Sequence, residues 1–237
     1  MRCTSVLKYN NVESSGTDVW QDQIRVSQTR EKASAAPFVP AKHSLKVLRP
    51  AVQQCRGCEL YKFPIQAVFG EGSATARLML IGEQPGDEED KRGEPFVGPA
   101  GRVLDEVLNE VGIERKDVYL TNAVKHFKFV ERGKRRLHQP PRLSEIIACR
   151  PWLEAELDAV KPKVLVCLGA TASKSVLGSK FSVMKDRGKI VESIYSKQVV
   201  ATIHPSAVLR AVDSDARKQL REFLKHDLAL AMRTVAS

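Results

Sequence analysis

Apolar residues along the chain fall into short continuous runs that alternate with segments of helical spacing. A short apolar run of this kind is typical of a strand buried on both faces of a sheet. The runs are ARLMLIG, DVYLTNAV, KVLVCLG and QVVATI. Strands that alternate with helices predict an α/β fold of three layers, α/β/α, around a central, mostly parallel four-stranded sheet.

The segments between and after these runs carry apolar residues at helical intervals. They are PAGRVLDEVLNEVG, LSEIIACRPWLEAELDAV, ATASKSVLG and DARKQLREFLKHDLALAMRTV. In the second of them, Ser144 is a possible helix cap and Pro151 a possible internal break. Residues 1–43 are polar with little periodicity, which predicts a flexible or weakly ordered N-terminal extension before a domain that spans residues 44–237.

Polar and chemically useful residues follow three of the predicted strands. Ligands of open parallel sheets bind beyond the carboxyl ends of the strands. The first strand runs into GEQPGD, which ends at Asp87, the second ends in Asn122, and the fourth ends in THPS, which contains His204. The segment PFVGPAG offers Phe96 as a stacking face. Each of these residues alone also fits an ordinary turn, core or solvated position, so only their combination predicts a site.

The balance of charge narrows the class of partner. Lysine and arginine number 38 against 28 acidic residues, a net charge of +10, and six of these cations lie between Lys125 and His138. Such an excess fits either a nucleic-acid partner or a generally basic surface. No apolar run approaches the roughly 20 residues of a membrane helix. We therefore expect a soluble, intracellular protein of cytoplasmic location, with no membrane partner, that acts as a monomer.

Four of the five cysteines are spaced like ligands of a metal centre. Cys55 and Cys58 form a CxxC pair, Cys149 lies in a predicted helix, and Cys167 lies in the following strand. An odd number of cysteines without a secretion signal argues against a disulfide framework. These four cysteines suit a [4Fe-4S] cluster, and zinc is the alternative that spacing leaves open.

The order of these motifs resembles that of a known family. GExPG, PFVGPAG, TN and HPS, with the cysteines interleaved, resemble the family 4 uracil-DNA glycosylases, which contain an iron–sulfur cluster. GEQPGDEED, TNAVKHFKF and KRRLH look like the UdgX subgroup. Members of that subgroup excise uracil and remain covalently joined to DNA through the histidine that ends the basic loop. That histidine corresponds to His138 here.

The resemblance implies a role for each residue. The catalytic residues would be His138 as nucleophile, Glu83 as stabiliser of the sugar cation or as base, and His204 as stabiliser of the departing uracil. Uracil would be bound by Gln84, Asp87, Phe96 and Asn122. DNA would be bound by Lys125, Lys134, Arg135, Arg136 and Ser206. The implied partner is uracil-containing DNA, preferably single-stranded.

Two other readings remain open at this point. A conventional family 4 glycosylase would turn over, and KRRLH would only contact phosphate. A non-catalytic iron–sulfur protein on the same scaffold would bind nucleic acid without excising a base.

Overall fold

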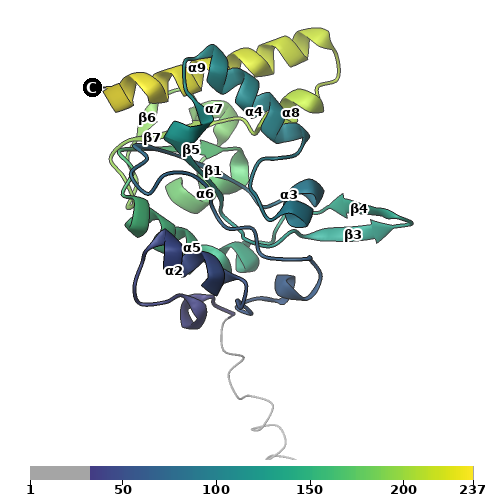
Figure 1. Cartoon of the computed structure of the whole chain (residues 1–237). Helices are drawn as coiled ribbons and strands as arrows, with labels where there is room; N and C mark the ends of the chain where they lie inside the picture. Colours follow the sequence, from purple (N-terminus) through teal and green to yellow (C-terminus); the bar gives the residue numbers. More distant parts are fainter. Residues whose placement is uncertain (1–32, 237) are drawn as a thin grey trace, which may run out of the picture. The chain divides into compact units, whose positions relative to one another are not determined.

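The central sheet is built from four fully buried apolar strands. The structure, a computed structural model, describes residues 33–236. The four strands are β1 (Leu78–Gly82), β2 (Val118–Asn122), β5 (Val164–Leu168) and β7 (Val199–Thr202). They run parallel in the order β2-β1-β5-β7, and a short strand β6 (Ile190–Val191) pairs antiparallel with β7 at the edge (Figure 1). The predicted α/β class is confirmed, with a fifth strand too short to show in the sequence.

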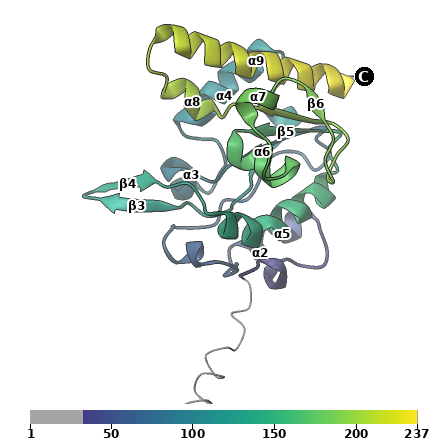
Figure 2. The same cartoon turned by 180° about the vertical axis from the view of Figure 1, so that it is seen from behind.

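Helices cover both faces of the sheet because successive strand residues point to opposite sides. On one face, α4 (Pro99–Glu110), α8 (Pro205–Leu209) and α9 (Ser214–Ala236) pack around residues such as Leu80 and Val166. On the other face, α5 (Leu143–Val160) and α6 (Ala170–Leu177) pack around Ile81 and Leu165, and α2 (Leu45–Val52) packs on α5 (Figures 1 and 2). None of the helices within residues 33–236 has the length and apolar character needed to cross a bilayer.

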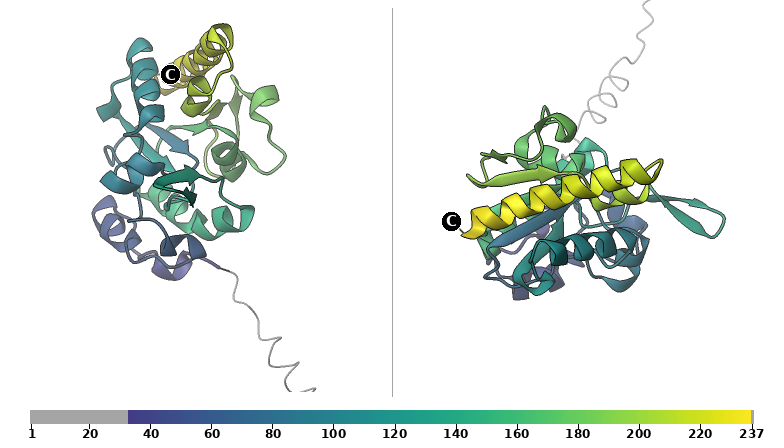
Figure 3. Two further views of the ribbon diagram at one scale, coloured as in Figure 1. Left: turned by 90° about the vertical axis from the view of Figure 1, so that its right-hand side faces the viewer. Right: turned by 90° about the horizontal axis from the view of Figure 1, so that it is seen from above.

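The remaining elements are short and connect these layers. They are η1 (Ala36–Phe38), η2 (Glu59–Lys62), α3 (Asp87–Arg92), η3 (Arg115–Asp117), β3 (Phe129–Arg132), β4 (Arg135–His138) and α7 (Val183–Asp186). The basic segment that the sequence suggested as a loop is therefore a hairpin, in which β3 and β4 pair antiparallel across a turn at Gly133 with φ +60°. The hairpin extends away from the main sheet (Figures 1 and 3).

Two details of the predicted helices differ from the structure. Helix α5 runs without interruption through Pro151, and the next residue in the helix, Trp152, is fully buried. The N-cap of α5 is Arg142 rather than Ser144, and the Arg142 N–H donates to a Glu145 carboxylate oxygen at 2.6 Å. The carboxylate of Glu145 therefore does the capping that a serine hydroxyl was expected to do.

The predicted N-terminal extension falls partly outside the structure. Residues 1–32 lie outside the described residues. Within residues 33–43, the side chain of Ala35 is buried, and its N–H donates to the Ala148 carbonyl at 2.7 Å. A Cβ atom on Gly57 would collide with the Ala35 backbone, so the glycine permits this close contact. Residues 33–43 thus pack with the domain that was predicted to begin at residue 44.

Candidate active site at the strand ends

The carboxyl ends of the strands bring together residues that are far apart in sequence. Gly82 at the end of β1 pairs in register with Asn122 at the end of β2. On its other side β1 pairs with β5, which in turn pairs with β7, and His204 lies two residues beyond the end of β7. The GEQPG, TN and HPS motifs therefore share one edge of the sheet, as expected for parallel strands.

Asn122 and Phe96 meet over Gly82. A Cβ atom on Gly82 would collide with both Asn122 Oδ1 and the ring of Phe96, so this position has no room for a larger residue. The Phe96 ring also lies beside His204, with ring centroids 6.2 Å apart and planes inclined by 28°. An aromatic face, a side-chain amide and an imidazole therefore surround one point at the tip of β1.

Phe96 has an uncommon backbone conformation, with φ +56° in the left-handed region. Arg115 holds this conformation, since its guanidinium donates to the carbonyls of Pro95 at 2.8 Å and of Phe96 at 3.2 Å. Gly101 is required beneath it, because a Cβ there would overlap the Phe96 carbonyl. Neither Arg115 nor Gly101 was given a role from the sequence, although Gly101 ends the PFVGPAG motif, because the contacts of both with Phe96 depend on the folded backbone.

A buried glutamate joins the two loops that form this part of the site. Glu89 accepts hydrogen bonds from the backbone N–H of Gly86 at 3.0 Å and of Gly98 at 2.7 Å. The GEQPG loop and the PFVGPAG loop are thereby held to one carboxylate. Glu89 was given no role from the sequence.

Glu83 lies between a hydroxyl and an imidazole. Thr171 Oγ1 donates a hydrogen bond to Glu83 Oε2, and His138 Nε2 is 3.3 Å from Glu83 Oε1. Burial alone would raise the pKa of the Glu83 carboxyl, but the hydrogen bonds from His138 and Thr171 and the nearby His204 hold it below its usual range. Glu83 is therefore an ionised carboxylate at neutral pH.

His138 is the exposed member of the site. It ends β4, pairs with Phe129 across the hairpin, and its ring centroid is 6.1 Å from that of Phe127. The His138 side chain is 47% exposed, whereas that of Glu83 is 24% exposed. The imidazole is thus accessible to a ligand and in contact with the carboxylate that could take its proton.

His204 is held as a neutral imidazole in one orientation. It is the N-cap of α8, and its Nδ1 accepts the backbone N–H of Ser206 at 3.1 Å. Burial lowers the pKa of His204 to about 4. Because Nδ1 accepts, the proton of the neutral ring is on Nε2, which can donate to an anion. The Ser206 hydroxyl, predicted to contact DNA, lies 2.7 Å from the same Nδ1.

Arg136 anchors the hairpin and does not extend toward solvent. Its guanidinium donates to Asp87 Oδ1 at 2.6 Å and to the fully buried Asp90. The same group lies over the rings of Phe127 at 5.5 Å and Phe129 at 5.0 Å. Arg136 was predicted to bind DNA and Asp87 to bind uracil, and the structure shows these two side chains paired with each other. Both roles stay predictions.

Gln84 performs a similar anchoring function. Its amide nitrogen donates to the carbonyls of Lys128 at 3.2 Å and Gln139 at 3.0 Å, on the two chain segments that flank the hairpin. Its amide oxygen accepts from the Lys128 N–H at 3.3 Å. The side chain predicted to contact uracil is therefore engaged in holding the hairpin beside the site.

Lys125 was also predicted to bind DNA, and its burial corrects that assignment. Its side chain is fully buried and pairs with the equally buried Glu156. Its Nζ also donates to Thr121 Oγ1 at 2.7 Å and to the Asn122 carbonyl at 2.8 Å. Lys125 therefore stabilises the end of β2. Of the predicted DNA-binding cations, Lys134 and Arg135 are exposed on the hairpin.

Three of the four predicted cluster ligands lie in one region of the core. Cys55 and Cys149 belong to the same buried apolar cluster, and Cys58 packs against it. Burial raises the pKa of the Cys149 thiol to about 12, opposed by Lys125, and Cys58 and Cys55 lie close enough to raise it further. Cys167 lies elsewhere, in the middle of β5 and in a different cluster.

The structure therefore does not assemble the predicted set of four cysteines. Among residues 33–236, no group of three or more His, Cys, Asp and Glu side chains is arranged to hold a single metal ion. An iron–sulfur cluster makes a different demand, because each ligand binds its own iron atom. His126, which had no predicted role, is buried and directly follows Lys125, whose N–H donates to Cys149 Sγ at 3.3 Å.

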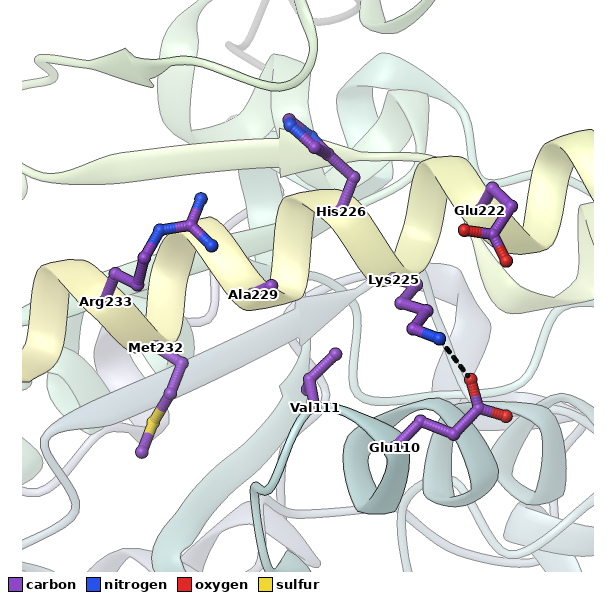
Figure 4. Close-up of a pocket in the computed structure, with 8 residues that line it drawn as sticks. All are labelled: Glu110, Val111, Glu222, Lys225, His226, Ala229, Met232 and Arg233. Carbon is purple, nitrogen blue, oxygen red and sulfur yellow. Dashed lines mark ion pairs between the residues drawn. The ribbon is translucent and has the colours of Figure 1, made fainter.

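One hollow on the surface lies away from this site. It is lined by residues of α4 and α9 and the turn that follows α4, including Glu110, His226 and Arg233 (Figure 4). Lys225 crosses it and pairs with Glu110 at 3.3 Å. None of the residues that line it belongs to the strand-end site.

Comparison with known proteins identifies the family to which the chain belongs. The family model of the uracil DNA glycosylase superfamily matches residues 69–228, which include the three strand-end motifs, the hairpin and Cys149. The chain belongs to the uracil DNA glycosylase superfamily.

Several relatives carry more specific names. The chain is 38% identical to the type-4 uracil-DNA glycosylase of Thermotoga maritima over 179 residues, 75% of this chain and 90% of that protein. It is 38% identical to the type-4 uracil-DNA glycosylase of Sulfurisphaera tokodaii over 80% of this chain and 86% of that protein. It is 30% identical to the type-5 uracil-DNA glycosylase of Pyrobaculum aerophilum over 67% of this chain and 74% of that protein.

Proposed function

We propose that this protein excises uracil from DNA and then remains covalently joined, through His138, to the deoxyribose that carried the base. This is the activity of the UdgX subgroup. The observation that carries the proposal is the pair formed by His138 and Glu83, 3.3 Å apart at the tip of β1. A role in phosphate binding alone would not require the histidine to face a carboxylate beside the base site.

Recognition of uracil begins once the nucleotide has turned out of the base stack. The base would stack on Phe96, and the Asn122 amide would hydrogen-bond to uracil O4 and N3–H. The lack of a side chain at Gly82 lets both of these groups lie against the tip of β1. A single-stranded substrate avoids the cost of opening a base pair, so we expect it to be preferred. All residues of the site come from one chain, which is consistent with an active monomer.

Cleavage of the glycosidic bond separates charge. The electron pair of the C1′–N1 bond leaves with uracil, so negative charge develops on its O2 and positive charge on the sugar. The neutral His204 would donate its Nε2 proton as a hydrogen bond to O2. The Glu83 carboxylate would stabilise the sugar cation. His204 and Glu83 lie close enough to interact electrostatically, so one can act on the uracil and the other on the sugar of the same nucleotide.

His138 would then form the bond that water forms in an ordinary glycosylase. Once the C1′–N1 bond has broken, Glu83 Oε1 takes the proton from His138 Nε2, and the lone pair that this frees on Nε2 forms the bond to C1′. Uracil leaves as an anion that takes a proton from water. The products are a neutral imidazole joined to C1′, a protonated Glu83 and free uracil. Cleavage of this link would require an imidazolide anion to depart, and such an anion is a poor leaving group, so the link would persist.

A denaturing gel tests this proposal. Wild-type protein mixed with a uracil-containing single-stranded oligonucleotide should give a species heavier by the mass of the oligonucleotide, and thymine DNA should give none. His138→Ser should abolish this species yet still release uracil, because Phe96, Asn122 and His204 remain in place. His226→Ser, at an exposed histidine of α9, is the matched control and should behave as wild type.

Peptide mapping separates the proposal from its main alternative. The link should map to the peptide that contains His138, and an adduct that persists in His138→Ser would falsify the assignment. The alternative is a conventional glycosylase that turns over, which the names of the type-4 relatives favour. In that case wild-type protein would release uracil and leave a free abasic oligonucleotide. Absence of uracil release would point to a non-catalytic DNA-binding protein.

We further propose that the protein holds a [4Fe-4S] cluster through Cys55, Cys58, Cys149 and His126. Three soft thiolate donors in one buried region suit such a cluster, and an imidazole can replace a thiolate as an iron ligand. Cys167 is a poor fourth ligand, since it lies inside the sheet in a different part of the core. The contribution of the cluster would be to brace the segment between β2 and the hairpin.

Metal analysis of single variants tests this ligand set. Purified wild-type protein should contain iron and sulfide and show visible absorbance. His126→Ala and Cys55→Ala should lose both, His126→Cys should keep them, and Cys167→Ala should be unaffected. Zinc without iron would contradict the cluster, and loss of iron in Cys167→Ala alone would restore Cys167 as a ligand.

A further inference from the structure

The strand between the two reactive sides of the site contributes no reacting group of its own. In the sheet, β5 lies between β1, which leads to Glu83, and β7, which leads to His204. The chain turns after β5 at Gly169 and enters α6 at Ala170. The first residues of α6 therefore begin between two side chains that the proposed reaction uses.

Gly169 allows this turn to pack tightly against His204. Its φ of +89° is unfavourable for residues with a side chain, and a Cβ there would lie 2.9 Å from His204 Cβ. Its N–H donates to the Thr202 carbonyl at 2.9 Å, which ties the start of α6 to the end of β7. The start of α6 is consequently held in place relative to His204.

Thr171, two residues later, contacts Glu83. Its hydroxyl donates to Glu83 Oε2, while the other carboxylate oxygen, Oε1, is the one that faces His138 Nε2. The two oxygens of one carboxylate thus have different partners from different elements, α6 and β4. A carboxylate held at one oxygen cannot rotate freely, so the contact with Thr171 decides where Oε1 points.

We propose that Thr171 is a positioning residue that orients the Glu83 carboxylate and keeps it charged, so that Oε1 faces His138 and the sugar. This inference rests on the role given to Glu83 in the proposed function. A hydroxyl that donates to a carboxylate favours its ionised form. The titratable groups that face Glu83 are His138 from β4 and His204 at the start of α8.

Two substitutions separate the hydroxyl from the packing of the side chain. Thr171→Val has nearly the same shape but no donor, whereas Thr171→Ser keeps the donor and loses a methyl group. We expect Thr171→Val to slow single-turnover uracil release by roughly 10- to 100-fold, in proportion to the loss of a hydrogen bond to a charged group. Thr171→Ser should stay within a few-fold of wild type. Ser175→Ala, which removes a hydroxyl bonded to the Thr171 carbonyl within α6, is the matched control.

The pH dependence of uracil release gives a second readout that a structural role would not change. Loss of the donor raises the pKa of Glu83, so the acidic limb of the rate profile should move to higher pH by about one unit in Thr171→Val. The comparison is made in the His138→Ser background, where His138 cannot contribute to the titration. A Thr171→Val protein with the rate and pH profile of its parent overturns the inference.

A direct titration distinguishes failure of this inference from failure of the proposed function. Carbon-13 NMR of labelled glutamate, assigned with Glu83→Gln, should show a higher pKa for Glu83 in Thr171→Val than in wild type. This measurement needs no activity, so it decides the contact even if the protein releases no uracil. An unchanged Glu83 pKa in a folded Thr171→Val protein refutes the role of Thr171, and full uracil release by Glu83→Gln refutes the role of Glu83 instead.

Discussion

Two histidines lie near Glu83, and the parts of the protein that carry them are built differently. The strand-end side of the site, formed by Phe96, Asn122 and His204, rests on the buried sheet and the helices that cover it. The hairpin side, formed by β3 and β4 with His138, extends from the domain (Figure 2). It is held by a few polar contacts around Arg136 and Gln84.

This difference matches the two tasks in the proposed reaction. Reading a base requires donors and acceptors fixed in position, and burial in the core supplies that rigidity. Burial also keeps His204 neutral, with a pKa of about 4, so that it can donate a hydrogen bond. A nucleophile must instead reach the sugar, and the half-exposed His138 on a hairpin can do so.

The largest expected effect is a loss of stability when the buried ion pair beneath the strand-end side, Lys125 with Glu156, is removed. Lys125→Met leaves Glu156 charged and unpaired in the core, which we expect to cost about 3–5 kcal/mol in the free energy of unfolding. Urea unfolding followed by circular dichroism measures this value. The double variant Lys125→Met with Glu156→Leu should recover much of the loss, and a double variant as unstable as the single one would contradict this account.

The next largest effect is expected on the rate of uracil excision when His204, the hydrogen-bond donor of the strand-end side, is removed. His204→Ala is expected to slow uracil excision by roughly 10²- to 10³-fold, the usual cost of losing one donor to a developing anion. The adduct should form more slowly by the same factor, since it depends on excision. His138→Ser should differ by losing the adduct alone, and equal loss of excision in the two variants would erase the distinction between the two sides.

Loosening the hairpin should have a smaller and more selective effect. Arg136→Gln removes the ion pairs to Asp87 and Asp90, so His138 is less well placed beside Glu83. We expect the yield of adduct per uracil released to fall roughly 10-fold, the scale of a hydrogen bond between charged groups. Quantifying free uracil and adduct from one reaction gives this ratio. An unchanged ratio would mean that Gln84 and the hairpin ladder hold His138 without Arg136.

The smallest effect is expected at the tip of the hairpin. Lys134→Gln and Arg135→Gln remove exposed cations, so each should reduce the slope of log affinity against log salt by about one. The adduct should still form at saturating DNA. Fluorescence anisotropy at several salt concentrations measures the slope, and a lost adduct at saturation would give these cations a part in the chemistry.

Much of the strand-end side could be predicted from the sequence. The four apolar runs specify buried parallel strands, and the carboxyl ends of such strands share one edge, so Glu83, Asn122 and His204 were expected to meet. The helices α4 and α9 follow from apolar spacing in the same way. These predictions succeed because hydrophobic period and strand direction are local properties that burial turns into a shared geometry.

Only the tertiary structure decided which charged residues are free to act. In sequence, Lys125, Lys134 and Arg136 look alike, yet the first is buried against Glu156, the second is exposed, and the third is paired with Asp87 and Asp90. Their partners lie up to 49 residues away along the chain. A charge in a sequence gives no information about such a partner.

The same reason explains the remaining differences. Cys167 was grouped with the other cysteines by spacing, but its strand places it inside the sheet. Thr171 carried no signal at all, because a threonine at the start of a helix is common and its contact with Glu83 spans 88 residues. The sequence by itself determined the layers and the edge at which chemistry could occur. The folded chain determined which side chains face one another there, because contacts between distant elements depend on how the layers pack.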